Sequence, residues 1–242
     1  MSASGYRNRR ELGDCRWIVW FAAAASVGWC SAVRADEAEL SLGLASSTVL
    51  RGVVLGDLTA RSMASYSTAA GWLTSLGVAA LQSPARHEKW EAQVSLKFGY
   101  TRVLDADWAW QSAYTHYAYP GSERLKLYAH HEVAATVAYR DLLYLSLAGL
   151  RNVHDFGESR TSVAYEIVAN HPLQSGLSAT AGIGYRAALH ADYDYAYGNA
   201  GIAARWRGAQ ADLVYIATDS GAKRRLGSAA ANRWTGSLTW RF

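Results

Sequence analysis

The sequence has few of the residues that stabilise small secreted domains or carry common redox chemistry. Its 242 residues include only two cysteines, three prolines and four phenylalanines. Both cysteines, Cys15 and Cys30, lie in the first 35 residues, a segment that we expect to be removed from the mature protein. The mature chain then has no cysteine, which excludes a disulfide, a thiolate metal site and a cysteine nucleophile.

A long hydrophobic run is also missing. The run from Trp17 to Trp29 is uncharged and mostly apolar, but its 13 residues are too few for a transmembrane helix, which needs roughly 20. Four basic residues precede it, Arg7, Arg9, Arg10 and Arg16, and Val33-Arg34-Ala35 offers small residues at both ends of a cleavage motif. We interpret residues 1–35 as a signal peptide and residues 36–242 as one mature domain; a buried N-terminal helix is the alternative.

Most of the excess positive charge belongs to this N-terminal segment. It holds five of the 24 basic residues and two of the 20 acidic ones, which leaves 19 basic and 18 acidic residues, a net charge of +1, in the mature chain. A nearly neutral chain lacks the basic surface that binds a phosphate backbone. We therefore expect no nucleic-acid partner.

What the mature chain does have is alternation with a period of two residues. In residues 90–101, one face carries Trp90, Ala92, Val94, Leu96, Phe98 and Tyr100, and the other carries Glu91, Gln93, Ser95, Lys97, Gly99 and Thr101. Successive side chains of a strand point to opposite faces, so this pattern predicts a strand with one apolar and one polar side. At about 10–13 residues, such runs are longer than the usual globular strand and match a tilted transmembrane strand.

Twelve such strands are predicted, and closed single-chain bacterial barrels have an even number. They cover residues 39–50, 59–69, 72–81, 90–103, 108–119, 124–139, 142–151, 160–169, 177–188, 195–206, 210–218 and 231–242. Tight turns alternate with longer polar loops, as expected for periplasmic turns and extracellular loops, with both mature termini periplasmic. Two connections depart from this alternation: residues 120–122 are short for an outer loop, and residues 170–176 are long for a turn.

The predicted fold class is therefore all-β, a transmembrane antiparallel up-and-down β-barrel in the outer membrane of a Gram-negative bacterium, in contact with its lipid. A soluble β-sandwich is the alternative for alternating strands. Aromatic residues at strand ends favour the barrel: Trp72, Trp90, Tyr100, Trp108, Tyr119, Tyr139, Trp206 and Trp234. The terminal Phe242 also favours it, and we expect this residue to be the contact with the barrel-assembly machinery.

Several short stretches resemble the Gcw-type conserved hypothetical outer-membrane proteins of proteobacteria, also described as TorF-type proposed porins. They are the stretch from Ser46 to Val53, which includes Arg51-Gly52, then Phe98-Gly99-Tyr100, residues 114–121, Leu127-Tyr128-Ala129 and Trp240-Arg241-Phe242. Two features depart from the family pattern: Val49-Leu50 stands where an aromatic residue is expected, and no proline follows the Arg-Gly pair. The resemblance implies a barrel with a transport role and brings no catalytic residues.

The seven histidines are the residues that could carry enzymatic or metal chemistry. Lipid-cleaving barrels pair a histidine with a serine two residues along the same strand face, and none of the seven histidines has one. His154-Asp155 with His190, Asp192 and Asp194 resembles the rim of an omptin-type protease, but solvated loop polarity explains these residues more simply. His130 and His131 are adjacent on a strand and point to opposite faces, so they cannot share a metal. We expect no enzyme, no metal and no cofactor.

The predicted inward face carries seven basic residues and four acidic ones. They are Arg61, Lys97, Lys126, Arg186, Arg205, Arg233 and Arg241, and Glu91, Glu132, Glu166 and Asp212. A basic residue at the lipid-facing midplane costs about 2–4 kcal/mol, so these charges are expected to line a lumen. The sequence thus predicts a narrow channel of low specificity for small solutes with a weak anion preference. A closed structural or surface-binding barrel is the alternative, and an outer-membrane hydrolase ranks third.

Overall fold

The computed structural model describes residues 36–154, 161–189 and 194–242. The predicted signal peptide lies outside these residues. Twelve antiparallel strands close into one barrel in which each strand pairs with its neighbours in the sequence and the last strand pairs with the first. Their bounds are β1 Glu37–Ala45, β4 Thr59–Ser67, β5 Trp72–Ser83, β6 Arg86–Val103, β7 Trp108–Ala118, β8 His130–Tyr139, β9 Leu143–Asn152, β10 Thr161–Gln174, β11 Leu177–Leu189, β12 Tyr195–Trp206, β13 Ala209–Thr218 and β14 Asn232–Arg241.

The barrel closes along a regular seam between β1 and β14. Leu42 lies opposite Trp240, and the backbone of Phe242 exchanges hydrogen bonds of 2.9 and 3.3 Å with Leu40. Closure leaves no strand edge without a partner, which a hydrocarbon environment requires. Among the described residues, no helix is long and apolar enough to cross a membrane.

The outer wall is apolar, and the soluble sandwich alternative is wrong. Large hydrophobic side chains stand exposed at alternate positions of the strands, including Leu40, Leu42, Leu44, Leu76, Val78, Leu96, Val133, Leu147, Ile167, Ile183, Ile202 and Leu213. Polar side chains between them are buried on the inner face, among them Ser41, Ser75, Thr115, Thr136 and Asn170. A protein in water would bury the first set, whereas a protein in lipid exposes it.

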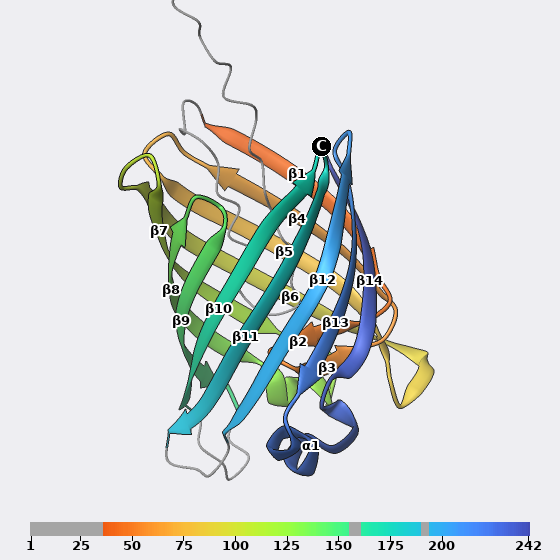
Figure 1. The fold of residues 1–242 in the computed structure, drawn as a ribbon. Helices are drawn as coiled ribbons and strands as arrows, with labels where there is room; N and C mark the ends of the chain where they lie inside the picture. The colour runs from red at the N-terminus through yellow and green to blue at the C-terminus, as the bar shows by residue number, and fades with distance from the viewer. Residues whose placement is uncertain (1–35, 155–160, 190–193) are drawn as a thin grey trace, which may run out of the picture.

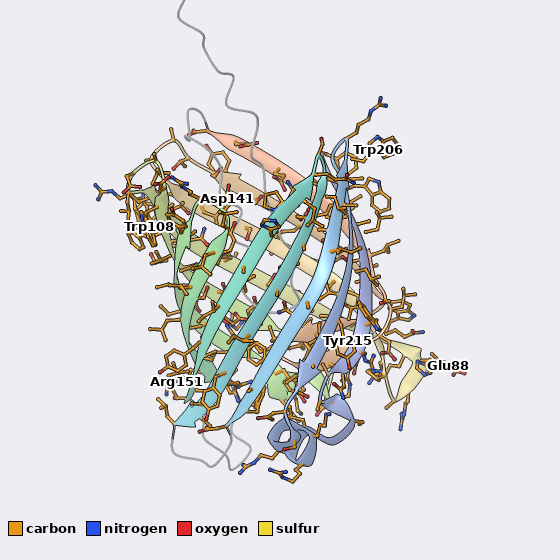
Figure 2. The ribbon with its side chains drawn as sticks, viewed as in Figure 1. Glu88, Trp108, Asp141, Arg151, Trp206 and Tyr215 are labelled. Atoms are coloured by element: carbon orange, nitrogen blue, oxygen red, sulfur yellow. The ribbon has the colours of Figure 1, made fainter. Side chains whose placement is uncertain are left out.

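Aromatic side chains gather at one end of this outer wall. Trp72 stacks on Phe98 with ring centroids 5.3 Å apart, and Trp108 packs against Tyr139 with ring centroids 4.9 Å apart. Figure 2 shows Trp108 and Trp206 near the end of the barrel that carries the C-terminus. Such a belt lies at a membrane–water boundary.

The connections alternate between short turns and longer loops with one exception, the two-residue turn Pro84-Ala85 between β5 and β6 at the loop end. Strand β10 continues through the residues expected to form a long turn, which leaves only Ser175-Gly176, with Gly176 at φ +76°. The expected start of the sixth strand, residues 124–129, instead belongs to a loop that contains the 3-10 helix η1, Leu125–Tyr128. Apart from this β5–β6 turn, the short turns between wall strands lie at the end that carries Glu37 and Phe242, and we assign this end to the periplasm.

The largest departure from the predicted strands is at the first one. Strand β1 ends at Ala45, and the residues that follow form a separate two-stranded hairpin, β2 Thr48–Leu50 and β3 Val53–Gly56. Figure 1 shows β2 and β3 at the loop end of the barrel, together with helix α1, Ser220–Leu226. This inserted hairpin, residues 48–56, is the feature around which the candidate site is built.

Candidate functional site

The inserted hairpin crosses the lumen from one wall to another. Its chain leaves β1 and returns to β4, while Arg51 at its tip forms an ion pair of 2.8 Å with Glu132 of β8, four strands beyond β4 in the barrel. On the way, Gly56 lies against Leu81 of β5. Because these partners are inward-facing residues of different strands, the hairpin lies inside the extracellular half of the lumen.

Arg51 is the charged anchor of the hairpin. The side chains of Arg51 and Glu132 are only 2% and 4% exposed, so both charges have left bulk water. Burial by itself lowers the pKa of the Arg51 guanidinium, but attraction and hydrogen bonding to Glu132, with smaller contributions from Tyr197 and Glu166, raise that pKa above its ordinary value. Glu132 also lies 3.6 Å from the Nε2 atom of His130. The guanidinium is therefore held as a cation inside the barrel.

The turn of the hairpin fits only a narrow space. Arg51 and Gly52 have φ values of +46° and +78°, which a tight turn of this hand requires and which glycine adopts without strain. A Cβ atom on Gly52 would lie 2.5 Å from Thr218 and 3.0 Å from Tyr197. Tyr197 in turn occupies the space left by Gly184, where a Cβ atom would lie 2.3 Å from its ring. The Arg-Gly pair is thus shaped to seat against the barrel wall.

Apolar contacts hold the two arms of the hairpin. Val53 and Leu55 belong to a buried cluster with wall and loop residues, which also contains Ala79, Leu81, Tyr119, Leu125, Ala129, Tyr195, Tyr197 and Ala222. Val49 and Val54 pack in a second cluster with Val214, Ile216 and Ala231. Water is therefore excluded from both faces of the hairpin. Tyr119, which is expected from the sequence at the aromatic belt, is buried in this packing together with Tyr195.

Two further loops lock the hairpin from outside. Arg124, in the loop between β7 and β8, donates from Nη2 to the Leu55 carbonyl at 2.6 Å and from Nε to Glu91 at 3.0 Å. In the loop that contains α1, the Ala231 amide donates to the Gly52 carbonyl at 2.7 Å. At its base, Asp57 accepts a hydrogen bond of 2.7 Å from Arg233. The extracellular mouth is thus closed by three loops that bond to one another.

The periplasmic half of the lumen is built differently, around three arginines. The Nε atom of Arg205 and the Nη2 atom of Arg241 both donate to the side-chain oxygen of Gln210, at 3.3 and 3.2 Å. Arg61 donates to Thr239 at 3.4 Å. Asp212 accepts hydrogen bonds from Gln210 and Ser237 beside them. Apolar packing in this half is limited to a small wall cluster near the β8–β9 turn, Ala138 and Tyr144 with Ala109 and Val168.

Ten of the eleven predicted lumen residues have inward parity in a strand or are buried on the inner wall. The exception is Lys126, which lies in the 3-10 helix and pairs with Glu123 in the same loop. The alternation of residues 124–129 predicted a strand, but these residues leave the wall to close the mouth. Strand β1 adds Glu37 and Glu39 to the inward set. Leaving aside the protruding tip of β6, the strands carry six basic and six acidic inward residues, so the predicted excess of seven over four is wrong.

Sequence reasoning also missed functional residues outside the strands. Arg51 stands out in the sequence only as part of a family motif, Asp57 falls in a predicted polar loop, and Arg124 falls at the start of the sixth predicted strand. The signal that could have found Arg51 is the Arg-Gly pair itself, because a positively charged residue beside a glycine in an otherwise apolar stretch, Val49 to Leu55, needs a buried partner. Its partner Glu132 could not be identified without the fold.

Of the histidines and aspartates considered as catalytic or metal-binding residues, those that the structure describes lie on strand β8 and in the extracellular loops. His130 points inward and His131 outward, as predicted from strand alternation. Asp194 accepts hydrogen bonds from the Tyr185 hydroxyl and the Ala188 amide, both at 3.0 Å, which gives it a structural role. Asp155, His190 and Asp192 lie outside the described residues.

A closed twelve-stranded barrel with an apolar outer wall and charges inside defines a transmembrane barrel of the bacterial outer membrane. The chain belongs to the family described as bacterial protein of unknown function (Gcw_chp), whose model matches residues 37–242. The predicted resemblance to Gcw-type proteins is thereby confirmed. The comparison with curated proteins gives no match.

Solved porin structures share the fold. The KdgM porin superposes with a TM-score of 0.56 at 9% identity, over 84% of this chain and 99% of that chain. A structure of the KdgM porin in complex with disordered oligogalacturonate superposes with a TM-score of 0.57 at 9% identity, over 85% of this chain and 98% of that chain. The NanC porin superposes with a TM-score of 0.52 at 10% identity, over 85% of this chain and 98% of that chain. At such identities the likeness concerns the fold alone.

Proposed function

We propose that this protein is a narrow outer-membrane channel for small solutes, closed toward the outside by the inserted hairpin. The observation that carries the proposal is the contrast between a mouth blocked by one hairpin and a periplasmic half lined by charges and small side chains. Inward positions there include Ser75, Gly77, Ser95, Gly182, Gly201 and Ala203. Eight strands close around their own side chains, and twelve enclose a wider bore.

Within this channel we assign a weak anion preference to the periplasmic half. Arg61, Arg205 and Arg241 converge there, and Arg205 and Arg241 share the neutral side-chain oxygen of Gln210. The inward carboxylates of this half, Glu37, Glu39 and Asp212, equal them in number, so the preference rests on the placement of the guanidinium groups. Fixed charge in a narrow bore with low-dielectric walls concentrates ions of opposite sign. The six basic and six acidic inward residues of the wall strands balance, and Arg51 of the hairpin adds one further basic charge, so the preference is modest.

A closed barrel with a structural or binding role is the second candidate. The burial of Arg51 and its neighbours favours it, because a hairpin that is seated in two apolar clusters resists displacement. The two candidates differ in one measurable respect. A channel conducts once the hairpin is removed, whereas a structural barrel has no continuous path to uncover.

Planar-bilayer conductance of refolded protein tests the proposal. Ala45 and Thr59 are paired across β1 and β4, so residues 46–58 can be replaced by a two-residue Asn-Gly turn without altering the wall. We expect low conductance with rare openings in the full chain and a several-fold larger, steady conductance in this hairpin-less variant. The matched control shortens the exposed tip of β5 and β6 by replacing residues 83–89 in the same way, and it should conduct like the full chain. No conductance in the hairpin-less variant would contradict the channel.

We also propose that the chain is not an enzyme and that Phe242 is read by the barrel-assembly machinery. Phe242 follows β14 and is 72% exposed, so its side chain is available to a partner before insertion. Replacing Phe242 with Ser should lower the amount of folded barrel in the outer membrane while leaving refolding in detergent unchanged. Equal membrane levels of both proteins would contradict this role.

A further inference from the structure

The outer wall carries a polar row that neither the channel nor the hairpin uses. His116 of β7, His131 of β8 and Arg151 of β9 lie opposite one another in register, and all three have the outward parity of their strands. Figure 2 shows Arg151 on the outside of the barrel toward the loop end. The next outward row toward the periplasm is Tyr114, Val133 and Gly149, and the rows beyond it carry no charged residue on these three strands.

The two histidines form an organised pair. Their rings stack with centroids 4.5 Å apart, and their Nδ1 atoms lie 3.2 Å from each other. The Tyr114 hydroxyl lies 2.7 Å from the Nδ1 atom of His131. Because Nδ1 is engaged on each ring, the remaining nitrogen, Nε2, is the one directed away from the barrel. Nε2 is also the ring nitrogen farther from the backbone, so it is the atom presented to the surrounding membrane.

The height of the row places it at the outer edge of the hydrocarbon. His116 is eight residues from Trp108 in the periplasmic belt, which at about 3.4 Å per residue and a tilt of about 40° corresponds to roughly 20 Å along the membrane normal. The apolar band of such barrels is about 25 Å tall. An outward arginine costs about 2–4 kcal/mol at the midplane and about 0–1 kcal/mol near the interface, so Arg151 is compatible only with the interface.

We propose that His116, His131 and Arg151 bind a phosphate group of a phosphorylated glycolipid in the outer leaflet. The Arg151 guanidinium and the Nε2–H of one neutral imidazole are suited to donate hydrogen bonds to phosphate oxygens. The ring that donates from Nδ1 to the other ring presents an Nε2–H only when it is protonated, and protonation also adds charge. The stacked rings fix the spacing of two of the donors in advance. The exposed Leu96 lies beside His116, and the exposed Leu189 lies beyond Thr161 on the Arg151 side, so both ends of the row offer apolar surface for acyl chains.

Native mass spectrometry of the refolded full chain with diphosphorylated lipid A tests the assignment. In the variant H116F/H131F/R151L the ring stack is kept, and phenylalanine and leucine are favoured on a lipid-facing wall, so the barrel should fold. We expect the apparent affinity for diphosphorylated lipid A to fall about tenfold, a change of about 1.4 kcal/mol. The matched control R102L removes an outward arginine of β6 at the periplasmic rim and should bind like the wild-type chain.

Two further arms separate the sources of phosphate. Lipid A stripped of its phosphates should bind the wild-type chain no better than it binds the triple variant. Inorganic phosphate at the same concentration as lipid A should not compete. Unchanged lipid A binding in the triple variant, equal binding of the stripped lipid by the wild-type chain, or competition by inorganic phosphate would each overturn the assignment.

Discussion

The two halves of the lumen stabilise their enclosed charges differently. In the extracellular half, Arg51 and Glu132 are buried together and surrounded by apolar clusters. In the periplasmic half, Arg205 and Arg241 share the neutral oxygen of Gln210 and lie among other polar groups. A desolvated pair is stable only in one geometry, whereas a polar network accommodates ions and water. Under the proposed function, the extracellular half acts as a seal and the periplasmic half acts as a conduit.

The seal should depend most strongly on the Arg51–Glu132 pair. Glu132→Gln leaves the Arg51 cation buried without its main partner, and removal of one member of a buried pair typically costs about 3–5 kcal/mol. We expect a loss in this range in the free energy of unfolding, measured by urea titration in lipid vesicles with tryptophan fluorescence. Open-channel time should rise toward that of the hairpin-less variant.

Two variants sharpen this prediction. The double variant R51M/E132Q removes both charges and should recover most of the lost stability. Glu123→Gln removes a solvent-exposed carboxylate that pairs with Lys126 in the extracellular loop and should leave unfolding unchanged. If the double variant were as unstable as E132Q alone, the ion pair would not be the anchor of the hairpin.

The second test leaves every charge in place and changes only shape. Gly52→Ala adds a methyl group 2.5 Å from Thr218 at a residue with φ +78°. Overpacking of this kind costs about 1–3 kcal/mol, so the hairpin should seat less tightly and conductance bursts should lengthen. Gly149→Ala is the matched control, because nothing lies within 4 Å of its added methyl group on the outer wall. Equal behaviour of the two variants would argue against a tightly seated turn.

A smaller effect is expected where the α1 loop joins the wall. Asp219 accepts hydrogen bonds from the Ala222 amide at 2.7 Å and the Ala196 amide at 3.0 Å. These bonds, led by that of Ala222, lower the pKa of Asp219. Asp219→Ala should destabilise the α1 loop by about 1 kcal/mol, seen as faster amide exchange in residues 220–226.

The pH dependence of this cap has a definite sign. Because the folded-state pKa of Asp219 is depressed, its contribution is complete above the unfolded pKa of about 4 and is lost as pH falls through the folded pKa. The difference in amide exchange rate of residues 220–226 between the wild-type chain and D219A should therefore be constant at neutral pH and shrink in strong acid. Asp219→Asn keeps a capping oxygen without a titrating charge, and its protection should not change with pH in that range.

The smallest effect concerns the conduit. Arg205→Glu with Arg241→Glu, made in the hairpin-less variant, should turn the weak anion preference into a weak cation preference, a change of roughly threefold in the permeability ratio. Reversal potentials in a KCl gradient measure it. The shift should weaken between 0.1 M and 1 M salt, as the screening length falls from about 10 Å to about 3 Å.

A control for this last test lies at the same rim. Arg207 is an exposed turn residue and Arg102 points outward, so R102E/R207E makes the same charge change outside the lumen. Its reversal potential should match that of the parent variant. A shift of the same size in the control would assign the preference to surface potential rather than to the lumen arginines.

The sequence and the structure agree best where a local rule is enough. The alternation in residues 90–103 and 195–206 predicts both the strands and the inward parity of Lys97 and Arg205. The same parity places Tyr195 and Tyr197 inward, whereas Tyr119 is expected at the aromatic belt from its strand-end position and is in fact buried inside. There a statistical habit of aromatic residues was preferred to the geometry of the strand, and the geometry was correct.

Agreement fails where a segment alternates but does not join the wall. Thr48, Val49 and Leu50 continue the period of β1, and residues 124–129 precede β8 with the same pattern. Alternation fixes which side chains share a face, but it does not specify the surface on which that face is buried. For the hairpin, that surface is provided by Glu132, Tyr197 and Val214, which are far away in the sequence.

The sequence by itself therefore determined the class of the protein, because residues 36–242 hold no cysteine, are nearly neutral and alternate in twelve strands whose backbone groups are all paired in lipid only when the barrel is closed. The tertiary structure alone decided which parts of that chain leave the wall and what they close. The physical reason is that strand parity is set by neighbouring residues, whereas the burial of Arg51 depends on a carboxylate 81 residues away. Only the closed barrel brings those two charges together.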